Sequence, residues 1–295
     1  MTQVPEREAL SLDIGGSHVT AARVSLQERE ILTGKIDCPV DPEANAEVLL
    51  DTWAAAALEA LDGYGPPARI GIAVPSPFDH AAGVSWMTHK FAALYGISVR
   101  EGLKKRWAGT PLRDAPLAFG NDADLFTLGE WWGGAARGAE RVIGVTLGTG
   151  LGSGFVAGGQ IITAGLDVPP GGELWRVSFM GGVAEDFASG RAVTQIYESH
   201  GKNQRSAAQV AALADAGDEL AWLAFKKLGT HLGGILLPWV AHFRPDCVVI
   251  GGNVARAWRH FQPALEKALP GRSCRVTKHF EDSALLGAAE LRRST

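Results

Sequence analysis

The sequence predicts an α/β fold built from a duplicated βββαβα unit. Two segments carry this prediction, LSLDIGGSHVTAARV at 10–24 and VIGVTLGTGLGSGFVAGGQII at 142–162, because each contains an apolar strand, a turn of small residues and a second strand. Buried-strand and helical patterns follow both segments, which is the order expected of layered α/β domains. Duplication is one interpretation. Two unrelated glycine-rich hairpins are the alternative.

In the first half, short apolar runs and β-branched residues predict the strands, and Ala- and Leu-rich stretches predict the helices. The predicted strands of this half cover 10–14, 19–24, 30–36, 69–74 and 117–119, and the predicted helices cover 44–61, 99–107 and 123–132.

The second half repeats the pattern, with strands before and after a long helical stretch. Its predicted strands cover 141–147, 152–157, 160–163, 246–250 and 275–278, and its predicted helices cover 206–214, 219–243, 254–269 and 283–293. We expect a small domain over 1–117 together with 283–295, and a large domain over 118–282.

Composition excludes several classes of protein. The 295 residues carry a formal charge of −4 with no block of like charge, so we expect no nucleic-acid partner. The chain has no apolar run before Leu10, and its most apolar segments, such as 233–243, are too short to span a bilayer. Three widely spaced cysteines form no CxxC pair. We therefore expect a cytoplasmic protein with inert thiols and no membrane partner.

Glycine is the outlying residue, with 37 of 295 positions, whereas about 7% is usual. Glycine-rich turns expose backbone N–H groups that bind anionic oxygens. If the two halves face each other, their turns would grip a nucleoside triphosphate from both sides of a cleft. No GxxxxGK[ST] motif occurs, and GTGLGSG leads into a strand rather than a helix, which disfavours a dinucleotide-binding fold.

Six motifs follow one another along nearly the whole chain. They are DIGGS (13–17), AVPSP (73–77), GNDADLFTLGE (120–130), TLGTGLGSG (146–154), VVIGGNV (248–254) and SALLGAAEL (283–291). In this order they resemble the ROK family (repressors, open reading frames and kinases), which has the two-domain actin-like ATPase, or ribonuclease H-like, fold. The resemblance implies an ATP-dependent sugar kinase whose active site lies in the interdomain cleft.

The resemblance also implies roles for single residues. Asp122 would be the general base that accepts the proton of the sugar hydroxyl, and Asn121 would orient the sugar; an Asn-Asp pair before a helix also predicts an N-cap. Asp13 would hold Mg²⁺, or else stabilise its turn. The residues implied for ATP and phosphate binding are Asp13, Gly15, Gly16, Ser17, Gly148, Thr149, Gly150, Gly251 and Gly252.

The sugar-binding segment departs from the family pattern. Glu173 and Glu185 match the two sugar-binding glutamates, but Arg176 occupies the position of the family's histidine. The cysteine-rich zinc loop between the glutamates is shortened to 177–183, so the sequence predicts no zinc ligands. Arg176 would donate to a sugar oxygen or form an ion pair with Glu173 or Glu185.

A second sugar-contacting loop of the family corresponds to 85–96, which lacks the usual asparagine. His89 and Lys90 are the polar candidates there, and we take Lys90 as a substrate ligand; ordinary exposed polar residues are the alternative.

The sequence thus predicts a glucokinase-like enzyme that uses ATP and Mg²⁺ to phosphorylate a hydroxyl of a hexose or N-acetylhexosamine. Three alternatives remain: a polyphosphate-dependent glucokinase, a sugar-binding protein without turnover, and a sugar-responsive regulator. A repressor of this family carries a helix-turn-helix segment, for which the first phosphate motif at Asp13 leaves no room. The resemblance also suggests a homodimer.

Overall fold

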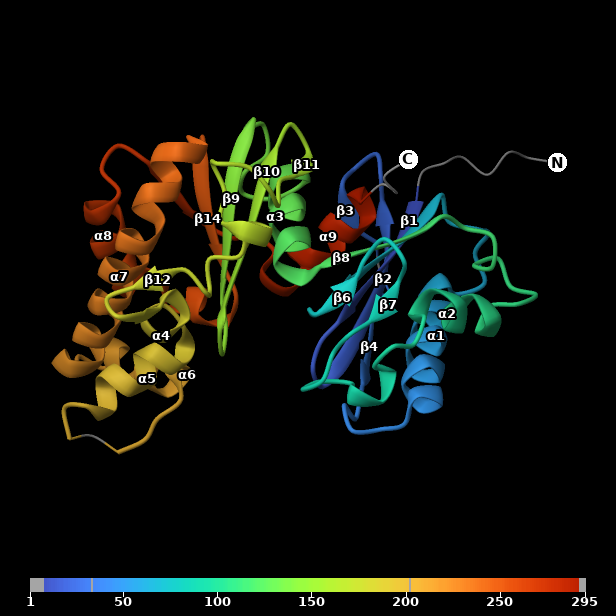
Figure 1. Cartoon of the computed structure of the whole chain (residues 1–295), viewed down its shortest axis with the longest axis horizontal. Helices are drawn as coiled ribbons and strands as arrows, with labels where there is room; N and C mark the ends of the chain where they lie inside the picture. The colour runs from blue at the N-terminus through green and yellow to red at the C-terminus, as the bar shows by residue number, and fades with distance from the viewer. Residues whose placement is uncertain (1–7, 33, 202, 292–295) are drawn as a thin grey trace. The chain divides into compact units, whose positions relative to one another are not determined.

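The chain forms two compact units in the computed structural model, which describes residues 8–32, 34–201 and 203–291. Unit 1 comprises residues 1–133 and 282–295, and unit 2 comprises residues 134–281. In Figure 1 unit 1 contains the blue strands and the closing red helix, whereas unit 2 runs from green to red.

Unit 1 contains a six-stranded mixed sheet and a small two-stranded sheet. Its strands are β1 (Glu8–Ile14), β2 (His18–Ser25), β3 (Glu30–Ile31), β4 (Ile36–Pro39), β5 (Arg69–Val74), β6 (Phe78–Asp79), β7 (Val84–Ser85) and β8 (Leu117–Asn121). The large sheet has the order β3-β2-β1-β5-β8, and β4 pairs with β2. β1 is antiparallel to β2 and parallel to β5, and β5 is parallel to β8. The carboxyl ends of β1 and β8 therefore lie at one edge of the sheet.

The helices of unit 1 are α1 (Ala46–Leu61), α2 (Val99–Arg106), α3 (Asp122–Trp132), α9 (Ser283–Glu290) and the short 3₁₀ helix η1 (Ala92–Leu94). Asn45 caps α1 by accepting from the Val48 N–H, and Ser98 caps α2. The core between sheet and helices is filled by fully buried aromatic side chains, among them Trp53, Phe91 and Trp107. α9 packs against α3, β1 and β5, so the last helix of the chain completes the first unit.

Unit 2 repeats the sheet of unit 1. Its strands are β9 (Arg141–Leu147), β10 (Leu151–Ala157), β11 (Gln160–Ile161), β12 (Ser178–Phe179), β13 (Gly182–Val183), β14 (Cys247–Gly251) and β15 (Ser273–Val276). The five-stranded sheet has the order β11-β10-β9-β14-β15, with β9 antiparallel to β10 and parallel to β14. This is the topology of β2, β1 and β5, which agrees with the predicted duplication.

The helices of unit 2 are α4 (Ala184–Phe187), α5 (Gly190–Glu198), α6 (Ala207–Asp215), α7 (Glu219–Phe243) and α8 (Trp258–Ala268). Short 3₁₀ helices are η2 (Pro170–Gly172), η3 (Asn253–Ala257) and η4 (Phe280–Asp282), which precedes α9. The buried face of α7 packs on the sheet side chains and on α8. Among the described residues, no helix combines the length and apolar character needed to cross a membrane.

The structure differs from the sequence prediction in the domain boundary, in the strand predicted over 30–36, where β3 ends at Ile31 and β4 begins at Ile36, and in several short elements such as α4. Unit 1 extends to Gly133, beyond the predicted boundary at 117, because α3 packs against α9. The helix predicted over 254–269 is divided into η3 and α8. Helix α5 and the β6–β7 and β12–β13 hairpins were not predicted.

Candidate active site

The first glycine-rich turn connects β1 to β2 in unit 1. It is closed by a 2.9 Å hydrogen bond from the Gly15 N–H to the His18 carbonyl. A methyl group on Gly15 would lie only 3.2 Å from the His18 carbonyl oxygen and ring, so a side chain there would crowd the turn. Asp13 is the next-to-last residue of β1 and is partly buried, which brings its carboxyl to the entrance of this turn.

The Asn121-Asp122 pair lies where β8 ends and α3 begins. The Asn121 side-chain oxygen accepts from the backbone N–H groups of Ala123 (3.0 Å) and Asp124 (3.3 Å), so Asn121 is the N-cap of α3. One of its amide hydrogens is donated to Ser76 Oγ at 3.1 Å. These bonds fix the asparagine and leave the exposed Asp122 carboxylate at the first turn of the helix.

The two carboxyl groups of this site influence each other. Dehydration by the surrounding protein, together with repulsion from Asp122, raises the pKa of Asp13 to about 7. Dehydration also raises the pKa of Asp122, although the residue keeps an exposed surface. The Ala123 N–H and the nearby Lys90 ammonium oppose that rise. A carboxyl with a raised pKa is a stronger base than an ordinary surface carboxylate.

The Lys90 side chain lies over the first glycine-rich turn. A methyl group on Gly16 would lie 3.7 Å from Lys90 Cε and 3.8 Å from its Nζ. Unit 1 therefore brings together the turn at Gly15–Ser17, the carboxyls of Asp13 and Asp122, and one ammonium group, from segments far apart in the sequence.

The second glycine-rich turn connects β9 to β10 in unit 2. The Gly148 N–H donates to the Gly150 carbonyl at 3.0 Å, and the Gly148 carbonyl accepts from the Gly190 N–H at 2.8 Å. Thr149 is exposed at the tip of the turn. A methyl group on Gly150 would overlap the carboxylate of Glu185, so this position requires glycine while Glu185 is in place.

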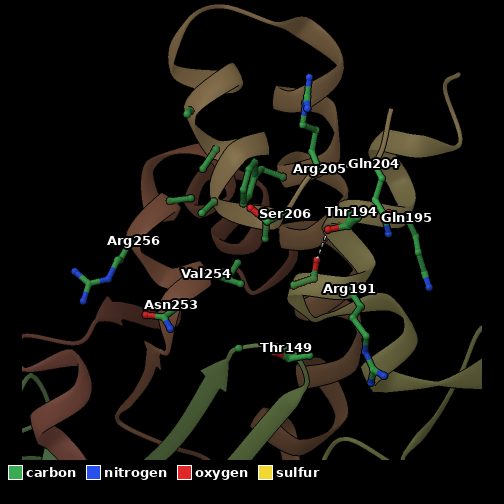
Figure 2. A pocket seen from close by; sticks show the side chains of 18 of the residues that line it. Thr149, Arg191, Thr194, Gln195, Gln204, Arg205, Ser206, Asn253, Val254 and Arg256 are labelled. Atoms are coloured by element: carbon green, nitrogen blue, oxygen red, sulfur yellow. Dashed lines mark hydrogen bonds between the residues drawn. The ribbon is translucent and has the colours of Figure 1, made fainter. Parts of the chain in front are cut away.

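A pocket of about 1050 Å³ opens beside this turn within unit 2 (Figure 2). Gly148 and Thr149 line it at the end of β9, and α5, α6 and η3 supply most of the remaining walls. Its apolar lining consists of Ala207, Ala208, Ala211, Ala212, Phe225, Val254 and Ala257, and its basic side chains are Arg191, Arg205 and Arg256.

The predicted adenosine turn lies at one margin of this pocket. Gly251 is the last residue of β14. Gly252 has a φ of +78°, and a methyl group added to it would lie only 2.5 Å from the Leu147 carbonyl oxygen. Asn253 and Val254, which follow directly, line the pocket. The two glycines thus position the lining segment.

The two predicted sugar glutamates are both paired with arginines. Arg176 forms a 3.1 Å ion pair with Glu173 and also donates to the Pro170 carbonyl. Glu185 pairs with Arg191 and accepts the Leu151 N–H at 2.9 Å. The ion-pair alternative for Arg176 is therefore the arrangement present, with Glu173 as its partner.

Comparison with known proteins agrees with the fold and the motifs. The family model described as "ROK family" matches residues 9–294. The chain belongs to the ROK family. It is 27% identical to a glucokinase of Thermotoga maritima over 98% of both chains, and 25% identical to an N-acetyl-D-glucosamine kinase of Haemophilus influenzae over 95% of this chain and 97% of that protein. The crystal structure of a ROK hexokinase from Thermus thermophilus matches with a TM-score of 0.80 and 26% identity, covering 96% of this chain and 97% of that one.

The ROK assignment confirms the family and the actin-like fold that the sequence predicted. It also makes the protein a carbohydrate kinase. The relatives that align over nearly the full length of both chains are named glucokinase, N-acetyl-D-glucosamine kinase and hexokinase.

This ROK protein has a short hairpin where the family resemblance places a zinc loop. β12 and β13 are joined by Met180 and Gly181, with φ values of +48° and +85°, as a two-residue hairpin turn requires at both central positions. Across residues 8–32, 34–201 and 203–291, no group of three or more His, Cys, Asp or Glu is arranged to hold a metal ion.

Sequence reasoning missed several residues that the structure places at these sites. Ser76 accepts a hydrogen bond from the Asn121 amide, and the AVPSP motif that contains it could have indicated a role at the site. Buried Ser153 accepts the Leu174 N–H (2.8 Å) and donates to the Gly172 carbonyl (2.7 Å), which fixes the segment carrying Glu173. Arg191 was missed because α5 itself was not predicted.

Proposed function

We propose that the protein is an ATP-dependent kinase that phosphorylates a hydroxyl of a hexose or N-acetylhexosamine, with Asp122 as the general base. One observation carries this proposal: Asp122, at the start of α3, shares its site with the first glycine-rich turn, the Asp13 carboxyl and the Lys90 ammonium. A base, an anion-binding turn and a charge partner are the parts that phosphoryl transfer requires.

The reaction follows from these parts. The sugar oxygen attacks the γ-phosphorus of ATP, and the bond between that phosphorus and the bridging oxygen breaks, leaving its electron pair on ADP. The hydroxyl proton passes to the Asp122 carboxylate. The raised pKa of Asp122 favours this transfer because it brings the base closer to the operating pH.

The pocket of unit 2 supports ATP over polyphosphate as the phosphoryl donor. A nucleobase is an apolar, flat group and fits walls made of alanines, Val254 and Phe225. A polyphosphate chain carries charge along its whole length, whereas the three arginines of this pocket share it with Glu198, Asp215 and the apolar walls. Thr149, in the turn at the pocket edge, supplies a hydroxyl and a backbone N–H for the donor phosphates.

The residues around Asp13 fit Mg²⁺. A carboxylate oxygen is a ligand that Mg²⁺ prefers, and a cation there would relieve the repulsion between Asp13 and Asp122 that raises the Asp13 pKa. Asp13 would hold the ion directly or through its water shell. When bound, Mg²⁺ supplies neutralisation of the donor phosphates.

Asn121 in unit 1, and Glu173 and Glu185 in unit 2, stay the proposed sugar ligands. Carboxylates accept hydrogen bonds from sugar hydroxyls, and the Asn121 amide is already oriented by its cap and by Ser76. We propose that Arg176, paired with Glu173, orients that glutamate at the end of the sugar for which the family uses histidine.

The proposal is tested by measuring the sugar phosphate that the purified protein forms, a product common to both phosphoryl donors. Common hexoses and N-acetylhexosamines are offered with ATP and, in parallel, with polyphosphate of matched phosphate content. We expect turnover of at least one sugar with ATP and little with polyphosphate. Turnover with polyphosphate alone would overturn the donor assignment, and no turnover with either donor would favour a sugar-binding or regulatory role.

Asp122→Asn tests the base. The change keeps the side-chain size and removes the proton acceptor, so kcat should fall by about 10²–10⁴-fold while the Kd for the sugar, measured by calorimetry, changes by less than about threefold. Asp114→Asn, an exposed change in the same unit, serves as the control. Undiminished turnover of Asp122→Asn would exclude Asp122 as the base.

Three further expectations stay predictions. Metal analysis of the purified protein should find no stoichiometric zinc, and one zinc per chain would refute the interpretation of the short β12–β13 hairpin. Light scattering tests the homodimer. Fractionation of the source cells tests the cytoplasmic location.

A further inference from the structure

The loop between β7 and α2 carries the exposed side chain of Lys90. Lys90 was predicted to contact the sugar. Its side chain lies across the first glycine-rich turn, with Cε and Nζ 3.7 and 3.8 Å from a methyl position on Gly16. No side chain on Gly16 separates the ammonium from the backbone of the turn.

The surroundings of this ammonium group indicate an anionic ligand. The turn contains the backbone N–H groups of Gly16 and Ser17, and N–H groups in glycine-rich turns bind the same anionic oxygens that a cation attracts. Lys90 also acts electrostatically on Asp122. The ammonium is therefore within electrostatic range of the base that takes the sugar proton and in contact range of the turn proposed to bind phosphate.

We infer that Lys90 is a catalytic residue that binds the γ-phosphoryl group of ATP, rather than a sugar ligand. This inference rests on the proposed function. As the oxygen–phosphorus bond to the sugar forms and the bond to ADP breaks, negative charge is spread over the three outer oxygens of the γ-phosphoryl group. The Lys90 ammonium neutralises part of that charge, and it also opposes the rise in the pKa of the neighbouring Asp122 carboxyl.

Lysine suits this role because its ammonium is a point charge on a flexible stem. It can follow the phosphorus as it moves from ADP to the sugar. The exposure of Lys90 also means that its substitution should leave the fold intact, so a loss of function can be assigned to the missing charge.

The kinetic test uses Lys90→Met, which keeps the length of the stem, and Lys90→Arg, which keeps the charge. With the best sugar found for the wild-type enzyme, kcat of Lys90→Met should fall by about 10²–10³-fold, as for loss of one transition-state donor. The Kd for the sugar should change by less than about twofold. The kcat of Lys90→Arg should be at least tenfold higher than that of Lys90→Met. Lys105→Ala, an exposed control on α2, should retain full activity.

A binding test separates failure of this inference from failure of the proposed function. The non-hydrolysable triphosphate AMPPNP and ADP are titrated into wild type and Lys90→Met. Because the lysine contacts only the γ-phosphoryl group, AMPPNP should bind at least fivefold more weakly to the variant and ADP within twofold of wild type. Equal changes for the two nucleotides, or a weakened sugar Kd with unchanged kcat, would overturn the inference. A wild-type protein that turns over no sugar but shows this AMPPNP difference would overturn the proposed function alone.

Discussion

Two carboxyl groups, from the ends of two strands, share the dehydrated site of unit 1. Asp13 comes from β1 and Asp122 follows β8, and these strands flank β5 in the sheet. Dehydration raises the pKa of both carboxyls. Only for Asp122 do the Lys90 ammonium and a backbone N–H oppose that rise. The pair therefore contains one carboxyl suited to accept a proton and another suited to a cation.

Asp13→Asn tests this interpretation through stability. The folded protein keeps the Asp13 proton up to about pH 7, whereas the unfolded chain loses it near 3.8. The carboxyl therefore stabilises the fold fully below pH 3.8, and this contribution is lost as the pH rises to 7. Each pKa unit corresponds to about 1.4 kcal/mol. From pH 4 to pH 8, the free energy of unfolding of Asp13→Asn should therefore rise by about 2 kcal/mol or more relative to that of wild type.

Urea unfolding without Mg²⁺ or nucleotide measures this difference at each pH. Asp114→Asn removes the same charge from an exposed position of unit 1 and should show no such trend. A stability difference between Asp13→Asn and wild type that stays constant from pH 4 to pH 8 would contradict the raised pKa.

The sequence yields candidate site residues, but it shows only partly how they are held. The Asn-Asp pair and both glycine turns follow strand ends, a pattern visible in the sequence. The sequence offered an N-cap as the alternative role of Asn121. The N-cap hydrogen bonds are present, and Asn121 also lies beside Asp122. The position of Lys90 over Gly16 could not be foreseen, because it depends on the path of a loop with few regular elements.

At the scale of elements, α3 and α9 approach each other more closely than most helix pairs. A methyl group on Gly129 would overlap the Ser283 carbonyl, and one on Gly287 would overlap the Leu125 carbonyl. Glycine on both helices thus allows backbone-to-backbone packing. Because Asp122 begins α3, this contact also fixes the direction of the helix that carries the base.

Gly287→Ala should destabilise the protein by about 2–3 kcal/mol, since the added methyl group forces the two helices apart. Gly234→Ala is the matched control, because it lies on the exposed face of α7 and meets only the rim of the Phe179 ring at 3.2 Å. The control should stay within about 1 kcal/mol of wild type, helped by the higher helix propensity of alanine. Chemical denaturation compares the two, and equal effects would refute the close-packing explanation.

Most strands and long helices were predictable because their apolar patterns extend over five or more residues. Arg69–Val74 and Glu219–Phe243 have the predicted bounds. The β12–β13 hairpin has only two residues in each strand and gives no period to detect. Helix α5 begins with glycine and contains Val193, Thr194 and Ile196, all weak helix formers, so its cap by Ser189 and its packing decide its conformation.

At the scale of the whole molecule, unit 1 is discontinuous in sequence. Its final helix follows all of unit 2 along the chain, and it fills the unit with buried side chains such as Leu285, Leu286 and Ala289. Domain membership therefore could not be deduced from continuity of the sequence. The prediction assigned the closing helix to the first domain, but placed α3 in the second.

Native-state hydrogen exchange tests this membership. Amides of α9 should exchange with the same opening free energy as those of β1 and β5, because a cooperative unit opens together. Amides of α8, the nearest long helix before it in sequence, should instead follow β9 and β14. Exchange is followed by mass spectrometry at increasing urea concentrations. A helix α9 that exchanges with α8 would contradict the division into units.

The placement of α9 has a consequence for synthesis on the ribosome. Chains emerge from the amino terminus and domains generally fold as units. The strands of unit 1 emerge first, yet the helix that covers β1 and β5 emerges only after residue 281. Unit 2, whose residues are continuous, is thus the first to have its complete sequence outside the tunnel. Until then, the faces of β1 and β5 that α9 covers in the folded protein have no such cover.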